Sequence, residues 1–299
     1  MESRGLLKSV NPMGDLSSPV GRSSSCPDWA TIDREILCPM CDYNLRGLTE
    51  SRCPECGYQF DWPAVLDPNL QTHPYLFEVH PERNVRSFLR TLVRGHGFWS
   101  FWKSLQPSQR SSTGRLAVYG IVCGFIALLP AILLVVLQVY QWHAVANPAA
   151  SFADMLTSAM REWPIRGVVA ACLIWALFPW LNFLALRVFA QSMRQARVKP
   201  IHVLRCAVYC ADLIVWNAII DLTAVLCYGY DLQYRSVEDR LMAMLSVSGA
   251  IMILLNFVRL ASAYRFYMKF PHVIATIAAS QVMVALAILV AVAYALYMF

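Results

Sequence analysis

Residues 116–140, LAVYGIVCGFIALLPAILLVVLQVY, contain no charged side chain. As a helix, these 25 residues would extend about 38 Å at a rise of 1.5 Å per residue. The hydrocarbon core of a bilayer is only about 30 Å thick. The segment therefore predicts a helix that crosses a membrane.

Four later stretches have the same apolar character, at residues 167–186, 203–228, 241–258 and 273–299. Residues 203–228, the third predicted span, contain Arg205, Asp212 and Asp221, whereas the other stretches carry no charge. A buried helix of a soluble protein could imitate one such run, but not five. The sequence predicts an all-α membrane bundle of five transmembrane helices.

The whole composition agrees with this interpretation. The chain has 299 residues, of which 58% are hydrophobic and 15% are charged, whereas soluble domains have about 25% charged residues. Twelve of the 19 acidic residues precede position 83. The net charge of +6 comes from basic residues beside apolar runs, which favours contact with a membrane surface over nucleic acid.

Loops rich in lysine and arginine alternate along the chain with loops that contain few of these residues. Seven lie in residues 83–115, four between the second and third spans, and three between the fourth and fifth. The two remaining loops hold two each. Because basic loops remain in the cytoplasm, the pattern predicts a cytoplasmic N-terminus and an external C-terminus.

The polar part of the chain divides into three segments before the membrane domain at 116–299. Residues 1–30 are rich in Ser, Pro and Gly and lack the apolar core of a signal peptide, so we expect a disordered leader. Residues 31–62 contain paired cysteines, and residues 63–115 form a basic, aromatic connector.

The connector predicts an interfacial helix in ERNVRSFLRTLV, residues 82–93. Val85, Phe88, Leu89 and Leu92 share one face of this helix, and Arg86, Arg90 and Arg94 share another. Such a helix would lie in the headgroup plane, with the aromatic residues of FWSFW (98–102) at the same depth. The alternative is a helix packed on the cysteine module. Residues 152–163 predict a further surface helix, which would lie along the outer surface of the membrane or cap the bundle there.

Two CxxC pairs give the clearest chemical signal. Cys38 and Cys41 are separated from Cys53 and Cys56 by 11 residues. This spacing suits four thiolates around a tetrahedral ion, with a β-hairpin between the pairs. It predicts a small zinc ribbon that obtains most of its folding energy from the metal, with iron as the alternative. Disulfides are disfavoured because we expect a reducing cytoplasm.

The residue after each pair is expected to need a left-handed backbone. Gly57 suits that conformation, and Asp42, at the corresponding position of the first pair, tolerates it better than most residues.

Residues 38–48, CPMCDYNLRGL, and 53–60, CPECGYQF, precede HPYLFEVHPERN (73–84) and an arginine- and tryptophan-rich connector. This arrangement resembles a bacterial family of zinc-ribbon membrane proteins that has no established activity. Asp42 departs from the glycine usual in that family. The resemblance implies a multi-pass protein of the bacterial inner membrane. The five-span region is also loosely similar to Yip-type proteins, which act in trafficking or scaffolding.

The charged residues of the third span allow two hypotheses. By helical rise, Asp212 lies about 13 Å into the span, and it could carry a proton or a cation. It could instead form a structural ion pair with Arg205, Arg187 or Arg259, which is the hypothesis we favour. Arg205 and Asp212, seven residues apart, share one predicted helix face, and Asn217 and Asp221, four residues apart, share another.

No nucleophile elbow, Walker loop, dinucleotide fingerprint or HExxH pair is present in the sequence, so we expect no catalysis and identify no small-molecule substrate. The sequence favours a ribbon that binds a protein through residues 43–52. Nucleic acid is disfavoured because Arg46 and Arg52 face several acidic side chains and an anionic metal–thiolate centre. The alternatives are a transporter or channel that uses Asp212, and a rubredoxin-like redox protein.

Overall fold

The computed structural model describes residues 26–145, 151–159, 163–188, 198–228, 235–269 and 273–298. Within them, five helical segments are long and apolar enough to cross a membrane, as predicted. Their bounds are Thr113–Gln141, Ile165–Val188, Pro200–Tyr228, Asp239–Met268 and Val273–Val290.

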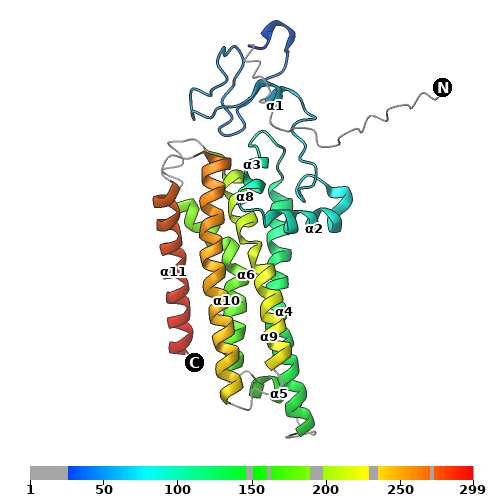
Figure 1. Cartoon of the computed structure of the whole chain (residues 1–299), viewed down its shortest axis with the longest axis vertical. Coiled ribbons are helices and arrows are strands. Elements are labelled where there is room, and N and C mark those ends of the chain that lie inside the picture. The colour runs from blue at the N-terminus through cyan, green and yellow to red at the C-terminus, as the bar shows by residue number, and fades with distance from the viewer. Residues whose placement is uncertain are drawn as a thin grey trace, which may run out of the picture.

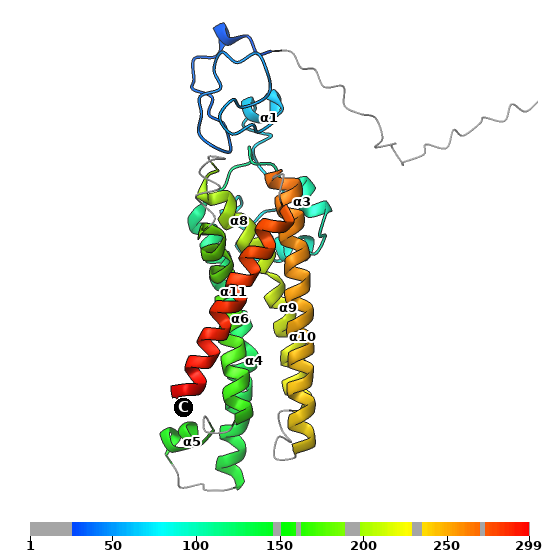
Figure 2. The same cartoon turned by 90° about the vertical axis from the view of Figure 1, so that its left-hand side faces the viewer.

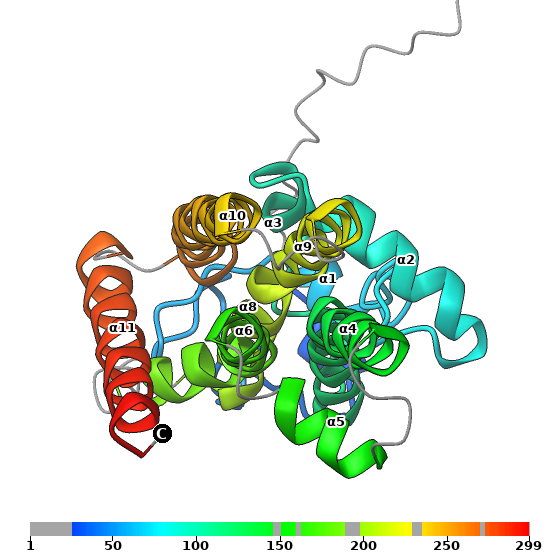
Figure 3. The same ribbon diagram turned by 90° about the horizontal axis from the view of Figure 1, so that it is seen from below.

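These segments belong to long helices that run side by side (Figure 1). The helices are α4 (Thr113–Val145), α6 (Trp163–Val188), α8 (Pro200–Ala211), α9 (Leu213–Tyr228), α10 (Arg235–Ser262) and α11 (Val273–Met298). The predicted third span consists of two helices, α8 and α9, which meet at Asp212. Seen from below, α8 lies among the other helices and α11 at the edge (Figure 3).

Helix α8 differs from the others because all of its residues from His202 to Ala211 are buried. By contrast, α4, α6, α9, α10 and α11 all carry exposed large apolar side chains. An apolar surface of this extent is typical of contact with lipid. Part of the predicted third span is therefore enclosed by protein, and α9 supplies the lipid-facing part.

Short elements belong to the N-terminal head and to the end of the bundle nearest to it. They are η1 (Trp29–Thr31), α1 (Trp62–Leu66), η2 (Pro81–Arg83), α2 (Asn84–Gly95), α3 (Ser100–Ser104) and the π-helix η4 (Ala263–Met268). Helix α5 (Phe152–Ala159) lies at the opposite end (Figure 2), where a surface helix was predicted.

Two sequence expectations differ in detail from the fold. Trp29, assigned to the leader, packs edge-on against Trp62 at 5.2 Å between ring centroids, so the ordered head begins before residue 31. Phe101 and Trp102, expected at headgroup depth, are buried. Trp102 contacts Tyr267, and Phe101 contacts Tyr209, because α3 packs its aromatic side chains against the bundle.

The rest of the predicted leader, residues 1–25, lies outside the described residues. Among the residues that are described, the head contains no strand, only the isolated antiparallel bridges Leu37–Asn44 and Arg52–Gln59. The β-hairpins of the ribbon remain a prediction.

Candidate metal centre

Two backbone turns of the same form carry the four cysteines. In the first, the Cys38 amide donates to the Tyr43 carbonyl and the Asp42 amide to the Cys38 carbonyl, at 2.8 and 3.0 Å. In the second turn, 15 residues later, the equivalent bonds run from Cys53 to Tyr58 and from Gly57 to Cys53, both at 2.9 Å. The head is thus built from a repeated cysteine turn.

The turns bring the four sulfurs together. The Sγ atoms of Cys38, Cys41, Cys53 and Cys56 all lie within 4.8 Å of one another. The Cys38–Cys56 distance is 3.7 Å and the Cys41–Cys53 distance is 3.5 Å. Four sulfurs bound to a tetrahedral ion at about 2.3 Å would lie about 3.8 Å apart, whereas a disulfide requires about 2.05 Å. The donor set fits one metal ion, and its geometry does not discriminate zinc from iron.

Each turn ends in a left-handed residue, as the sequence suggested. Asp42 has φ 63° and Gly57 has φ 70°. Asp42 also has a role that glycine lacks, since its carboxylate forms an ion pair with the Lys199 ammonium of the bundle. This contact gives a physical reason for an aspartate at a position that favours glycine.

The first cysteine turn is bonded to the start of α8. His202 Nε2 donates to the Pro39 carbonyl at 2.9 Å, and the Lys199 amide donates to the Met40 carbonyl at 2.9 Å. Pro39 and Met40 stand between two of the cysteines. The position of the cysteine cluster is therefore set by the bundle as well as by the head.

The second turn has its own contact with the bundle. Lys269, the left-handed residue that ends η4, places its ammonium 5.5 Å from the centroid of the Tyr58 ring. Tyr58 follows the turn of Cys53 and Cys56 and stacks on Phe60. Both cysteine turns of the head are therefore in contact with the bundle.

A buried polar network continues from the first turn into the bundle. The Tyr267 hydroxyl donates to His202 Nδ1 at 2.6 Å and accepts from Arg205 Nη1 at 2.9 Å. Arg205 Nε lies 2.8 Å from Glu78 Oε1, and both side chains are fully buried. The Tyr209 hydroxyl donates to the same carboxylate at 3.2 Å. Burial raises the pKa of Glu78, and the Arg205 guanidinium opposes that rise.

Asp212 belongs to a second network. Arg259 Nη1 donates to Asp212 Oδ1 at 2.5 Å, and the Tyr119 hydroxyl donates to Oδ2 at 3.0 Å. Of the three proposed partners, Asp212 therefore pairs with Arg259, while Arg205 pairs with Glu78 of the connector. A Cβ on Gly95 would lie 3.0 Å from Asp212 Oδ2, so Asp212 lies at the level of α2 rather than in the middle of the bundle.

Asp221 lies elsewhere, in α9. Its carboxylate accepts hydrogen bonds from Asn217 Nδ2 at 2.5 Å and from Ser248 Oγ at 3.1 Å. The structure thus places Arg205, Asp212 and Asp221 in three different sets of contacts and does not bring them together as one site.

Sequence reasoning did not identify His202, Lys199 or Glu78 as part of the site. Glu78 had a detectable signal, because it is an isolated acid in the apolar run YLFEV, and buried charges are normally paired. His202 and Lys199 carried no signal, because their contacts with Pro39, Met40 and Asp42 connect segments far apart in the chain.

Nothing among protein-family models, curated proteins or solved structures matches the chain.

Proposed function

We propose that the chain is a non-catalytic integral membrane protein that displays a zinc ribbon as a docking module for another protein. The observation that carries this proposal is the cluster of four cysteine sulfurs within 4.8 Å, held by turns that are bonded to a bundle of membrane-length helices. Because a four-thiolate centre has no open position for a substrate, it suits a structural role.

The proposed location is the bacterial inner membrane, with the ribbon in the cytoplasm and the C-terminus outside. The alternation of basic loops supports this orientation, and the resemblance to bacterial zinc-ribbon membrane proteins supports the compartment. A cytoplasmic ribbon would keep its thiols reduced and available to a metal.

The proposed docking surface is the segment of residues 43–52, between the two cysteine turns, which the sequence predicted as a hairpin. Tyr43 is exposed, and so are Arg46 and Glu50. The first turn contacts the bundle through Pro39, Met40 and Asp42, which leaves the exposed side chains of this segment for a partner.

Two alternatives remain, of which one uses the same four cysteines and the other uses Asp212. Iron in place of zinc would make the head a redox centre, and the four sulfurs would accept it equally well. A transporter based on Asp212 is less well supported, because Arg259 and Tyr119 already neutralise and bond this carboxylate.

Elemental analysis of the purified full-length protein tests the metal. We expect one zinc ion per chain in the wild type, none in a Cys38→Ser, Cys41→Ser variant, and one in the control Cys26→Ser, because Cys26 lies outside the cluster. Visible ferric–thiolate absorption bands would show that the bound metal is iron rather than zinc. A metal-free wild-type protein would contradict the hypothesis that the four cysteines form a metal-binding ribbon.

Co-purification tests the docking role. We expect a protein partner that is captured by the wild type and by Cys26→Ser and is lost from the double variant. Equal capture by all three would contradict docking through the ribbon, and labelling of the head from outside the cell would contradict its cytoplasmic location.

A further inference from the structure

Helix α2 has three faces, whereas the sequence suggested two. Ser87, Thr91, Leu92 and Gly95 are buried against the protein. Val85, Leu89 and Val93, spaced by four residues, remain 73%, 52% and 59% exposed. The side chains of Arg86, Arg90 and Arg94 follow the same spacing beside them and are also exposed. The helix therefore presents an apolar row and a basic row to its surroundings.

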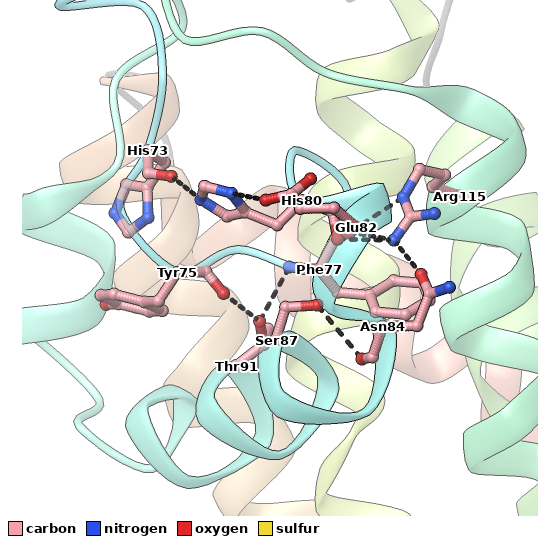
Figure 4. Close-up of polar contacts among 9 residues, drawn as sticks. All are labelled: His73, Tyr75, Phe77, His80, Glu82, Asn84, Ser87, Thr91 and Arg115. Carbon is pink, nitrogen blue, oxygen red and sulfur yellow. Dashed lines mark hydrogen bonds and ion pairs between the residues drawn. The ribbon is translucent and has the colours of Figure 1, made fainter.

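The orientation of α2 is fixed by contacts on its buried face. Thr91 Oγ1 accepts from the Phe77 amide at 3.0 Å and donates to the Tyr75 carbonyl at 3.3 Å, and the Phe88 ring lies 4.9 Å from the Tyr119 ring. Figure 4 shows the Thr91 contacts joining α2 to the segment before it. The apolar row is thus held outward.

The start of α2 is held in the same way. Arg115, near the beginning of α4, donates from Nη2 to the Asn84 side-chain carbonyl at 2.8 Å and from Nε to the Phe77 carbonyl at 2.9 Å (Figure 4). The helix lies across the bundle rather than along it (Figure 1), which is the direction of a helix in a headgroup layer.

A groove of about 720 Å³ lies beyond the C-terminal end of α2. Ligand pockets are typically about 300–1,000 Å³. One wall is the turn from His96 to Ser100 together with Lys103, and the other wall is Leu255 and Val258 of α10. Trp99, in the turn, is 63% exposed.

The groove is continuous with the apolar outer surface of α10, where Ile251, Leu254 and Val258 are exposed. The chain segment that forms one of its walls is also basic. Residues 84–104 include Arg86, Arg90, Arg94 and Lys103 and no acidic residue. An apolar groove that opens beside basic side chains is complementary to a lipid with an acyl chain and an anionic headgroup.

We propose that this groove binds an anionic phospholipid. The acyl chain lies along Leu255 and Val258, the phosphate contacts the Lys103 ammonium, and the arginine row of α2 attracts further anionic headgroups. The Val85, Leu89 and Val93 row enters the acyl boundary of the same leaflet. The inference rests on the membrane location proposed above and is independent of the metal.

The test uses the full-length protein in nanodiscs of phosphatidylcholine that contain phosphatidylglycerol, followed by native mass spectrometry of the lipids retained after mild detergent extraction. We expect preferential retention of phosphatidylglycerol. Lys103→Gln should reduce that preference about fivefold, as expected for one basic residue near a membrane surface. Val258→Trp should fill the groove and lower retention without removing a charge. Arg46→Gln, in the ribbon, should leave retention unchanged.

Equal retention of the two lipids by the wild type would overturn the proposal, and so would an equal loss in Lys103→Gln and Arg46→Gln. A stable dimer that retains neither lipid would overturn it too, because the groove would then belong to a second copy of the chain. A failure of the membrane location would differ from all of these, because the chain would then be extracted from membranes by alkaline carbonate.

Discussion

Asp42 combines a backbone role with a tertiary contact. A non-glycine residue in the left-handed region costs about 1–2 kcal/mol, and Asp42 has φ 63°. Its ion pair with Lys199 offsets part of that cost, since an exposed pair contributes at most about 1 kcal/mol. The first cysteine turn therefore accepts backbone strain and gains a contact with the bundle. In the second turn, Gly57 adopts the same left-handed conformation without strain.

We predict different costs for two substitutions of Asp42. Asp42→Gly loses the ion pair but relieves the backbone, so the free energy of unfolding of the head should change by less than about 1 kcal/mol. Asp42→Ala loses the ion pair and adds strain, because alanine tolerates the left-handed region less well than aspartate, so it should destabilise the head by about 1–2 kcal/mol. The rate of metal loss to a chelator, measured on the intact protein, reports both effects. Similar acceleration by both variants would show that the ion pair dominates and the backbone does not.

At the scale of elements, the sequence predicted that α2 is amphipathic but did not predict the direction of each apolar side chain. The predicted faces of α2 were only partly right, because Phe88 and Leu92 are directed toward the protein while Val85 and Leu89 are not. Periodicity identifies an amphipathic helix but does not show which apolar side chains contact protein and which contact lipid.

Gly95 is the position where α2 meets the Asp212–Arg259 pair. A Cβ there would lie 3.0 Å from Asp212 Oδ2 and 3.1 Å from Arg259 Nη2. We predict that Gly95→Ala lowers the free energy of unfolding by about 1–3 kcal/mol, because a well-packed interior resists added volume. Gly114→Ala is the matched control, since a Cβ on Gly114 would meet nothing within 4 Å. Thermal unfolding in detergent compares the two. Equal melting temperatures would mean that α2 moves away from the ion pair without cost.

At the scale of the whole molecule, two buried ion pairs connect segments that are distant in sequence. Glu78 of the connector pairs with Arg205 of α8, and Asp212 pairs with Arg259 of α10. Both pairs lie toward the end of the bundle that carries the head, since Glu78 belongs to the connector and Asp212 lies beside Gly95 of α2. Arg205 thus joins the connector to the bundle, and Asp212 joins the third span to α10, which explains how the span can include both charges.

We predict that Asp212→Asn and Arg259→Gln each cost about 3–5 kcal/mol, because each leaves one buried charge without its partner. The double variant should cost clearly less than the sum of the single variants. Unfolding in mixed micelles of increasing denaturing detergent gives all three values. A fully stable Asp212→Asn protein that had lost an ion-dependent flux would instead support the transporter.

The sequence by itself determined the features that depend on local composition and spacing. Runs of apolar residues identified the five helical segments of membrane length, since each span satisfies its backbone hydrogen bonds internally. The two CxxC pairs identified the four sulfurs, because short spacing alone brings each pair together.

Only the tertiary structure decided the partners of the charged and polar groups. Arg205 and Asp212 lie seven residues apart and share a predicted face, yet they bond to Glu78 and Arg259. Likewise, the contact of His202 with Pro39 spans 163 residues. A buried charge requires a partner, but packing chooses it from every element that reaches the same depth, and the sequence pattern of one helix does not contain that information.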